Sequence, residues 1–183
     1  QQLPGAKFFK GKAIIFIVGS RPGGSYDTVG RLLSKYIAKY TGARVIVKNV
    51  EGGGGIQGGN AIYTSNPDGL TLGLLNAGMM QEQTLGGKGV RFDLNKYTWY
   101  GRVLTSADCT GVSAKSNFRS VEDLLAAPSF KEGNAGAGSV AFLKSVLLKK
   151  AIGWNSKMVS GYGNTSEMLL ALIRGEIDSV ATT

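Results

Sequence analysis

Four glycine-rich stretches, at residues 19–27, 51–59, 134–139 and 160–165, each lead into a segment with helical periodicity. The start of a helix leaves the N–H groups of its first turn unpaired, and the helix dipole adds partial positive charge there. Such a site can bind a carboxylate or phosphate without a cationic side chain. If the fold brings the four stretches to one cleft, we predict that they bind one anion together.

The composition argues against several other kinds of chemistry. The 183-residue chain has no His and one Cys, so it cannot form a His-based catalytic triad, an internal disulfide or most zinc sites. It also contains no Ser-x-x-Lys motif. We therefore expect no enzyme activity, no metal site and no cofactor. Cys109 is interpreted as a small buried hydrophobic residue.

The chain is basic, with 21 Lys and Arg against 12 Asp and Glu and a formal net charge of +9. The cations are dispersed, which is typical of a solvated surface, and the positive potential would favour an anionic small molecule. No cluster of cations interleaved with aromatic residues occurs, so nucleic acid is not expected as a partner. No apolar stretch reaches the ~20 residues of a membrane span.

Two stretches also resemble dinucleotide-binding loops. Residues 53–58 fit Gly-x-Gly-x-x-Gly, and residues 136–141 fit the variant that ends in Ala. That motif places an acidic residue about 20 residues further on to bind a ribose. Residues 73–81 and 155–165 contain no carboxylate. A nucleotide- or dinucleotide-dependent enzyme therefore remains only the alternative.

The first two glycine stretches fall in a block of alternating strands and helices. Residues 14–18 are β-branched and aromatic, which predicts a strand buried on both faces of a parallel sheet. Residues 44–50 and 70–76 predict two further strands, and Gly42 predicts the end of the first helix. The buried stripe of that helix is predicted to contain Val29, Leu32, Leu33, Tyr36, Ile37 and Tyr40. Residues 1–103 thus form a predicted first lobe.

The other two glycine stretches fall in a predicted second, partial lobe, residues 104–183. A short strand at 99–103 is predicted to leave the first lobe. The predicted elements of the second lobe are a strand at 109–114, a helix opened by a capping box at Ser120–Asp123, a helix at 139–152, a strand at 157–160, a helix from Asn164 and a strand from Ile177. The helix at 139–152 is predicted to bury Val140, Leu143, Leu147 and Ala151.

The order and spacing of several short motifs resemble one known family, the solute receptors of tripartite tricarboxylate transporters, often called Bug receptors. No single motif is diagnostic, but together they extend over nearly the whole chain. The matching motifs are Arg21-Pro-Gly-Gly-Ser-Tyr-Asp27 with Arg31, Val47-Lys-Asn49 with Gly52–Gly55, Asn66–Thr71, Ser120–Leu124, Gly136–Ser139, and Gly161-Tyr162 before a helix that ends at Gly175–Asp178.

The resemblance implies an α/β fold of the type II periplasmic binding protein kind, with two Rossmann-like lobes flanking a ligand cleft. It implies a monomeric receptor, secreted with a signal peptide absent from this chain, that passes its ligand to membrane transporter subunits. The ligand would be a small organic carboxylate: a di- or tricarboxylate, an aromatic acid or an acidic amino acid. Family members are longer, which implies that the C-terminal third is absent here.

The resemblance also implies which residues surround the ligand. They are Arg21, Pro22, Gly23, Gly24, Ser25 and Asp27 in the first stretch, Asn49, Gly52 and Gly53 in the second, Asn76, Ala77, Gly78 and Met79 after the third strand, Gly136, Ala137, Gly138, Ser139 and Val140 before the long helix, and Tyr162. From the residues alone, Asp27 is better interpreted as a cap or turn residue. Glu51 stands where the family often has proline, which places a negative charge near the expected anion site.

Overall fold

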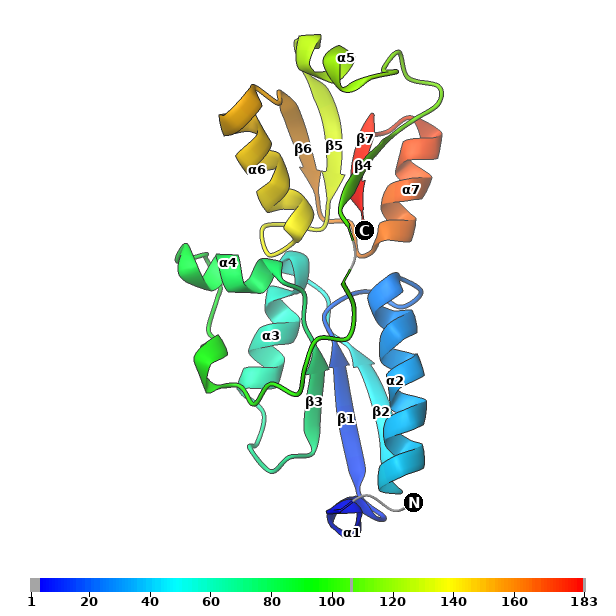
Figure 1. Cartoon of the computed structure of the whole chain (residues 1–183), viewed down its shortest axis with the longest axis vertical. Coiled ribbons are helices and arrows are strands. Elements are labelled where there is room, and N and C mark those ends of the chain that lie inside the picture. Colours follow the sequence, from blue (N-terminus) through cyan, green and yellow to red (C-terminus); the bar gives the residue numbers. More distant parts are fainter. Residues whose placement is uncertain (1–3, 106, 183) are drawn as a thin grey trace.

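The computed structural model describes residues 4–105 and 107–182 and contains two sheets joined end to end (Figure 1). The first sheet has the order β2-β1-β3 and is entirely parallel. Its strands are β1 (Ala13–Val18), β2 (Arg44–Asn49) and β3 (Thr71–Leu74). β1 lies in the centre with Ile14, Phe16 and Val18 buried, as the apolar run predicts.

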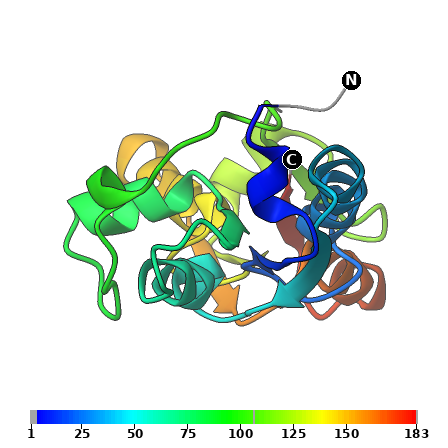
Figure 2. The same ribbon diagram turned by 90° about the horizontal axis from the view of Figure 1, so that it is seen from below.

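The helices of this part connect and flank the strands. Their bounds are α1 (Ala6–Phe9), α2 (Ser25–Thr41), the 3-10 turn η1 (Gly53–Gly55), α3 (Ile56–Tyr63), α4 (Gly78–Thr84) and the 3-10 turn η2 (Leu94–Lys96). Figure 2 shows α2 and α3 on different sides of the sheet, as right-handed crossovers to opposite edges require. α2 ends at Gly42, whose φ of +70° is the left-handed conformation that glycine adopts readily.

The buried face of α2 differs from the predicted stripe. Asp27, Gly30 and Ser34 are buried, whereas Leu32 and Tyr36 are about half exposed. A Cβ atom at Gly30 would lie 2.7 Å from Cγ2 of Val18. The helix therefore approaches β1 through its small residues, which turns part of its apolar stripe toward solvent.

The second sheet has the order β4-β7-β5-β6, with β4 antiparallel to β7 and the other pairs parallel. The strands are β4 (Cys109–Val112), β5 (Phe130–Asn134), β6 (Ser156–Ser160) and β7 (Ser179–Thr182), and the helices are α5 (Val121–Ala126), α6 (Val140–Ile152) and α7 (Thr165–Arg174). α7 packs through Met168 and Leu172 against Val180, while α6 covers the other face, where Ser145 contacts Glu132.

Three predictions in this region are wrong. Residues 99–103 form no strand and are exposed. Cys109 is also exposed, because it is the first residue of an edge strand. In α6, Leu147 and Ala151 are exposed and Ser145 is buried, because this helix packs over a polar strand. The predicted capping box at Ser120 and Asp123 is present.

The sequence patterns do not predict β5. Four of its five residues are Lys131, Glu132, Gly133 and Asn134, yet Glu132 and Asn134 are fully buried. The Glu132 carboxylate accepts hydrogen bonds from Ser145 Oγ at 2.7 Å and from Trp154 Nε1 at 3.1 Å. Removal of one hydrogen-bond partner from a buried polar group costs about 1–3 kcal/mol in proteins.

We expect Trp154→Phe to lower the free energy of unfolding by about 1–3 kcal/mol, because the buried Glu132 carboxylate loses a donor. Urea unfolding measures this change. The control is Trp99→Phe, whose indole N–H donates to the Leu94 carbonyl at 3.0 Å from a half-exposed ring. A loss no larger for Trp154→Phe than for the control would contradict this role of Trp154.

The ends of the strands face each other across the molecule. The carboxyl ends of β1, β2 and β3 point toward those of β5 and β6 (Figure 1). In open α/β sheets this edge is where ligands bind. Within the described residues, no helix combines the length and apolar character needed to cross a membrane.

Candidate functional site

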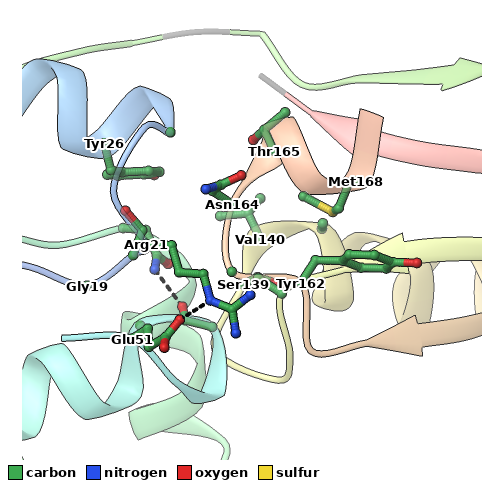
Figure 3. A pocket seen from close by; sticks show the side chains of 18 of the residues that line it. Gly19, Arg21, Tyr26, Glu51, Ser139, Val140, Tyr162, Asn164, Thr165 and Met168 are labelled. Carbon is green, nitrogen blue, oxygen red and sulfur yellow. Dashed lines mark hydrogen bonds and ion pairs between the residues drawn. The ribbon is translucent and has the colours of Figure 1, made fainter. Parts of the chain in front are cut away.

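A cleft of about 400 Å³ lies between the two sheets (Figure 3). Its walls are the loops that follow β1, β2 and β3 on one side and β5 and β6 on the other. The starts of three long helices line it: Gly24–Tyr26 of α2, Ser139–Ala141 of α6 and Gly163–Thr165 of α7. The η1 turn contributes Gly53–Gly55. The four predicted glycine stretches therefore converge on one cavity.

Free backbone donors face this cavity. Ser139 Oγ accepts the N–H of Phe142 at 3.3 Å, and Asn164 Oδ1 accepts that of Glu167 at 2.9 Å. These caps occupy only the third N–H group of each helix. Within the described part of the chain, the N–H groups of Val140 and Thr165 have no acceptor. Together with the helix dipoles they form a setting that favours a bound anion.

The two halves of the molecule touch directly beside the cleft. The Gly138 N–H donates to the Gly53 carbonyl at 3.0 Å, and the Arg21 N–H donates to the Gly163 carbonyl at 3.1 Å. A Cβ atom at Gly54 would lie 2.5 Å from the backbone nitrogen of Ser139. Only glycine allows this approach, which brings the two halves into direct contact; we call this arrangement closed.

An ion cluster spans the same contact. The Arg21 guanidinium donates from Nη1 to both carboxylate oxygens of Glu167 at 2.9 Å and from Nε to Glu51 (Figure 3 labels Arg21 and Glu51). These bonds, first to Glu167 and then to Glu51, raise the pKa of Arg21. The pKa of Glu167 is lowered first by the Gly163 N–H and then by Arg21. Arg21 and Glu167 therefore stay charged.

A buried carboxylate shapes the loop after β1. Asp27 is 4% exposed and accepts hydrogen bonds from Arg31 Nε at 2.9 Å, the Gly23 N–H at 3.0 Å and Asn49 Nδ2 at 2.9 Å. These bonds, the one from Arg31 above all, lower the pKa of Asp27 to about 2. Asn49 Nδ2 also donates to the Ser20 carbonyl at 2.9 Å. Asp27 and Asn49 thus hold the loop after β1 in place without lining the cleft themselves.

The residues that the resemblance implies fall into two groups. Those that line the cleft are Arg21, Gly24, Ser25, Gly52, Gly53, Asn76, Ser139, Val140 and Tyr162. Those that do not line it are Pro22, Gly23, Asp27, Asn49, Ala77, Gly78, Met79, Gly136, Ala137 and Gly138. Several of the second group support the wall: Met79 is buried in the core, and Gly138 makes the contact between the halves.

Several further side chains line the cleft that the sequence patterns do not assign to ligand binding, among them Tyr26, Asp108, Lys144 and Met168. Lys144 could have been found, because it follows Val140 by four residues and so shares its helix face. Asp108 lies on the segment between the two sheets, and no local pattern marks it. The described residues contain no group of three potential metal ligands.

The sequence and fold match known proteins. The family model described as "Tripartite tricarboxylate transporter family receptor" matches residues 29–183. A protein of Agrobacterium vitis described as "UPF0065 protein in the TAR-I ttuE-ttuC' intergenic region" is 29% identical over 171 residues, which are 90% of this chain and 49% of that protein. The chain thus spans about half the length of this curated relative.

Two solved structures share the fold. One is described as the structure of a periplasmic transporter; it is 25% identical, with a TM-score of 0.83 over 93% of this chain and 59% of that one. The other is malate-bound MatC of Rhodopseudomonas palustris, at 22% identity and a TM-score of 0.84 over 93% of this chain and 60% of that one. The α/β fold of the periplasmic binding protein kind is therefore confirmed.

The matched family also decides between the two functional classes considered. It is a family of transporter receptors rather than enzymes, so the nucleotide-dependent enzyme is set aside. The resemblance drawn from the short motifs is confirmed by a match that extends over most of the chain. The chain belongs to the tripartite tricarboxylate transporter receptor family.

Proposed function

We propose that the intact protein is an extracytoplasmic receptor that binds a small organic carboxylate in this cleft and presents it to membrane transporter subunits. One observation carries the proposal: the starts of α2, α6 and α7 line a single cavity, and N–H groups of α6 and α7 there lack protein acceptors among the described residues. The malate bound by MatC, which shares the fold, is in keeping with it.

Carboxylate binding would favour the closed arrangement of the two halves. A hydrogen bond from a backbone N–H to a charged oxygen contributes roughly 1.5–3 kcal/mol. A carboxylate can receive such bonds from α2 and α6 together only while the halves are in contact. The ligand therefore binds the closed state more tightly and shifts the population toward it.

The proposal is tested by calorimetry on the intact protein with carboxylic acids and their primary amides. We expect each acid that binds to do so at least tenfold more tightly than its amide. A charged carboxylate oxygen accepts a stronger hydrogen bond from a backbone N–H than a neutral amide oxygen does. Equal affinity for acid and amide would contradict the proposal. Saturable binding of NAD or ATP instead would restore the nucleotide alternative.

Ser139→Leu should reduce carboxylate affinity at least tenfold, because the longer side chain enters the cleft in front of the α6 N–H groups. The variant also loses the cap on Phe142, which costs about 1 kcal/mol of stability. The matched control is Ser120→Leu, which removes the equivalent cap of α5 outside the cleft. Calorimetry and thermal unfolding of both variants separate the effects. An equal affinity loss in both would contradict this position for the ligand.

A further inference from the structure

We infer that the cleft selects a zwitterion, with one carboxylate, one ammonium and an otherwise uncharged body, over a dicarboxylate or tricarboxylate. This inference rests on the proposed carboxylate-binding function and concerns the same site. It follows from the charged side chains that line the cleft, which are Arg21, Glu51, Asp108 and Lys144.

Arg21 is already neutralised by protein carboxylates. Its guanidinium lies between Glu51 and Glu167 and forms hydrogen bonds with both. One positive and two negative charges leave this part of the wall with an excess of negative charge. A ligand carboxylate that approached Arg21 would be repelled by Glu51, which also lines the cleft.

Lys144 is the cation available to a ligand. Its Nζ donates to Thr110 Oγ1 at 2.8 Å and to the Cys109 carbonyl at 3.4 Å, and both acceptors are neutral. Among residues 4–105 and 107–182, no carboxylate is within ion-pair distance of Lys144. An ammonium has three donors, so one remains for a ligand. Because Lys144 lies one turn after Val140, a single carboxylate can use this donor and the first-turn N–H groups of α6.

Asp108 is the corresponding anion. It directly precedes Cys109 and Thr110, the two residues that contact Lys144 Nζ, so the opposite charges lie at the same end of the cleft. The described part of the chain offers Asp108 no ion pair. Asp108 and Tyr26 both line the cleft, and burial and, next, the charge of Asp108 raise the pKa of Tyr26. A ligand ammonium in the cleft would be paired with Asp108.

The rest of the cleft suits an uncharged body. Tyr26, Val140, Tyr162 and Met168 line it. A second ligand carboxylate would find no further unpaired cation among the described residues that line the cleft, and it would lie in the field of Glu51 and Asp108. The charged side chains that line the cleft therefore match an amino acid whose own side chain is uncharged.

The test is calorimetry of the intact protein with three six-carbon compounds: hexanoate, L-norleucine and adipate. Norleucine should bind at least tenfold more tightly than either of the others. Asp108→Asn should reduce norleucine affinity at least tenfold and leave hexanoate affinity unchanged. The control is Glu122→Gln, which removes the same charge from an exposed position on α5 and should change none of the affinities.

The possible results separate the inference from the proposed function. Tighter binding of adipate than of norleucine would overturn the preference for a zwitterion and leave carboxylate binding in place. A norleucine preference that survives in Asp108→Asn would overturn the assigned role of Asp108. Failure of all three compounds to bind would count against the inference and the proposed function together.

Discussion

Gly78→Ala is expected to reduce carboxylate affinity about 100-fold while both halves of the protein stay folded. Gly78 is the first residue of α4, and a Cβ atom there would lie 2.4 Å from the Gly138 carbonyl oxygen in the other half. The φ of Gly78 is not in the left-handed region, so alanine introduces no backbone strain. The added methyl group should therefore hold the halves apart.

The affinity loss would arise because the closed state becomes rare. When only a fraction of the molecules can close, the apparent dissociation constant rises by the inverse of that fraction. A 100-fold change corresponds to about 2.7 kcal/mol of added cost for closure. Calorimetry measures the affinity, and circular dichroism reports the fold.

Gly111→Ala is the matched control for this substitution. Gly111 lies in β4, and an added Cβ atom would meet Val180 at 3.8 Å, an ordinary contact. We expect this variant to bind carboxylate as the unaltered protein does. Undiminished affinity in Gly78→Ala would show that ligand binding does not need the contact between Gly78 and Gly138.

Asp27→Asn is expected to lower the free energy of unfolding by about 2–4 kcal/mol at neutral pH. The carboxylate accepts from Arg31, Gly23 and Asn49, and its replacement leaves these three donors without their charged acceptor. The side-chain amide of asparagine would also place its own N–H donors against the donors that the Asp27 carboxylate accepts. For a domain of this size the melting temperature should fall by roughly 5–15 °C.

The same carboxylate predicts a pH dependence. Its pKa in the folded protein is about 2, below the ordinary value of 3.8. The unfolded chain therefore binds the proton more readily, so this stabilisation is present above about pH 4 and is lost as the pH falls toward 2. The difference corresponds to about 2 kcal/mol. Urea unfolding between pH 2 and 7 should show this loss in the unaltered protein and less of it in Asp27→Asn.

Asp68→Asn is the matched control, because Asp68 is an exposed turn residue whose carboxylate accepts, from the part of the chain that the structure describes, only the Leu70 N–H. Its stability should change by less than about 1 kcal/mol. Equal losses for the two variants, or an unaltered pH profile in Asp27→Asn, would contradict the buried network around Asp27.

Local patterns predict the parts of this fold that depend on neighbouring residues. The apolar run of β1 and the left-handed glycines that end α2, α6 and α7 are examples: Gly42, Gly153 and Gly175 have φ values of +70°, +75° and +76°. Each follows from one residue type in one short segment. The four glycine-rich helix starts were found in the same way, and these supply most of the cleft wall.

Features that depend on distant residues could not be predicted in this way. β5 has a polar sequence and becomes central because β6 and β7 pair with it from both sides. The buried face of α2 differs from the predicted stripe because Gly30 lets the helix approach β1 closely. Asp108 reaches the cleft only because the chain crosses from one sheet to the other near it. These features arise from contacts between residues that are distant in the sequence.

The most direct test of the account is an NMR titration of the ¹⁵N-labelled intact protein with a carboxylate that binds. The backbone N–H signals of Tyr26 in α2 and Val140 in α6 should both shift and should saturate with one common dissociation constant, because both helix starts line the same cavity. Shifts confined to one of the two helix starts, or two different dissociation constants, would contradict a single anion site shared by the two halves.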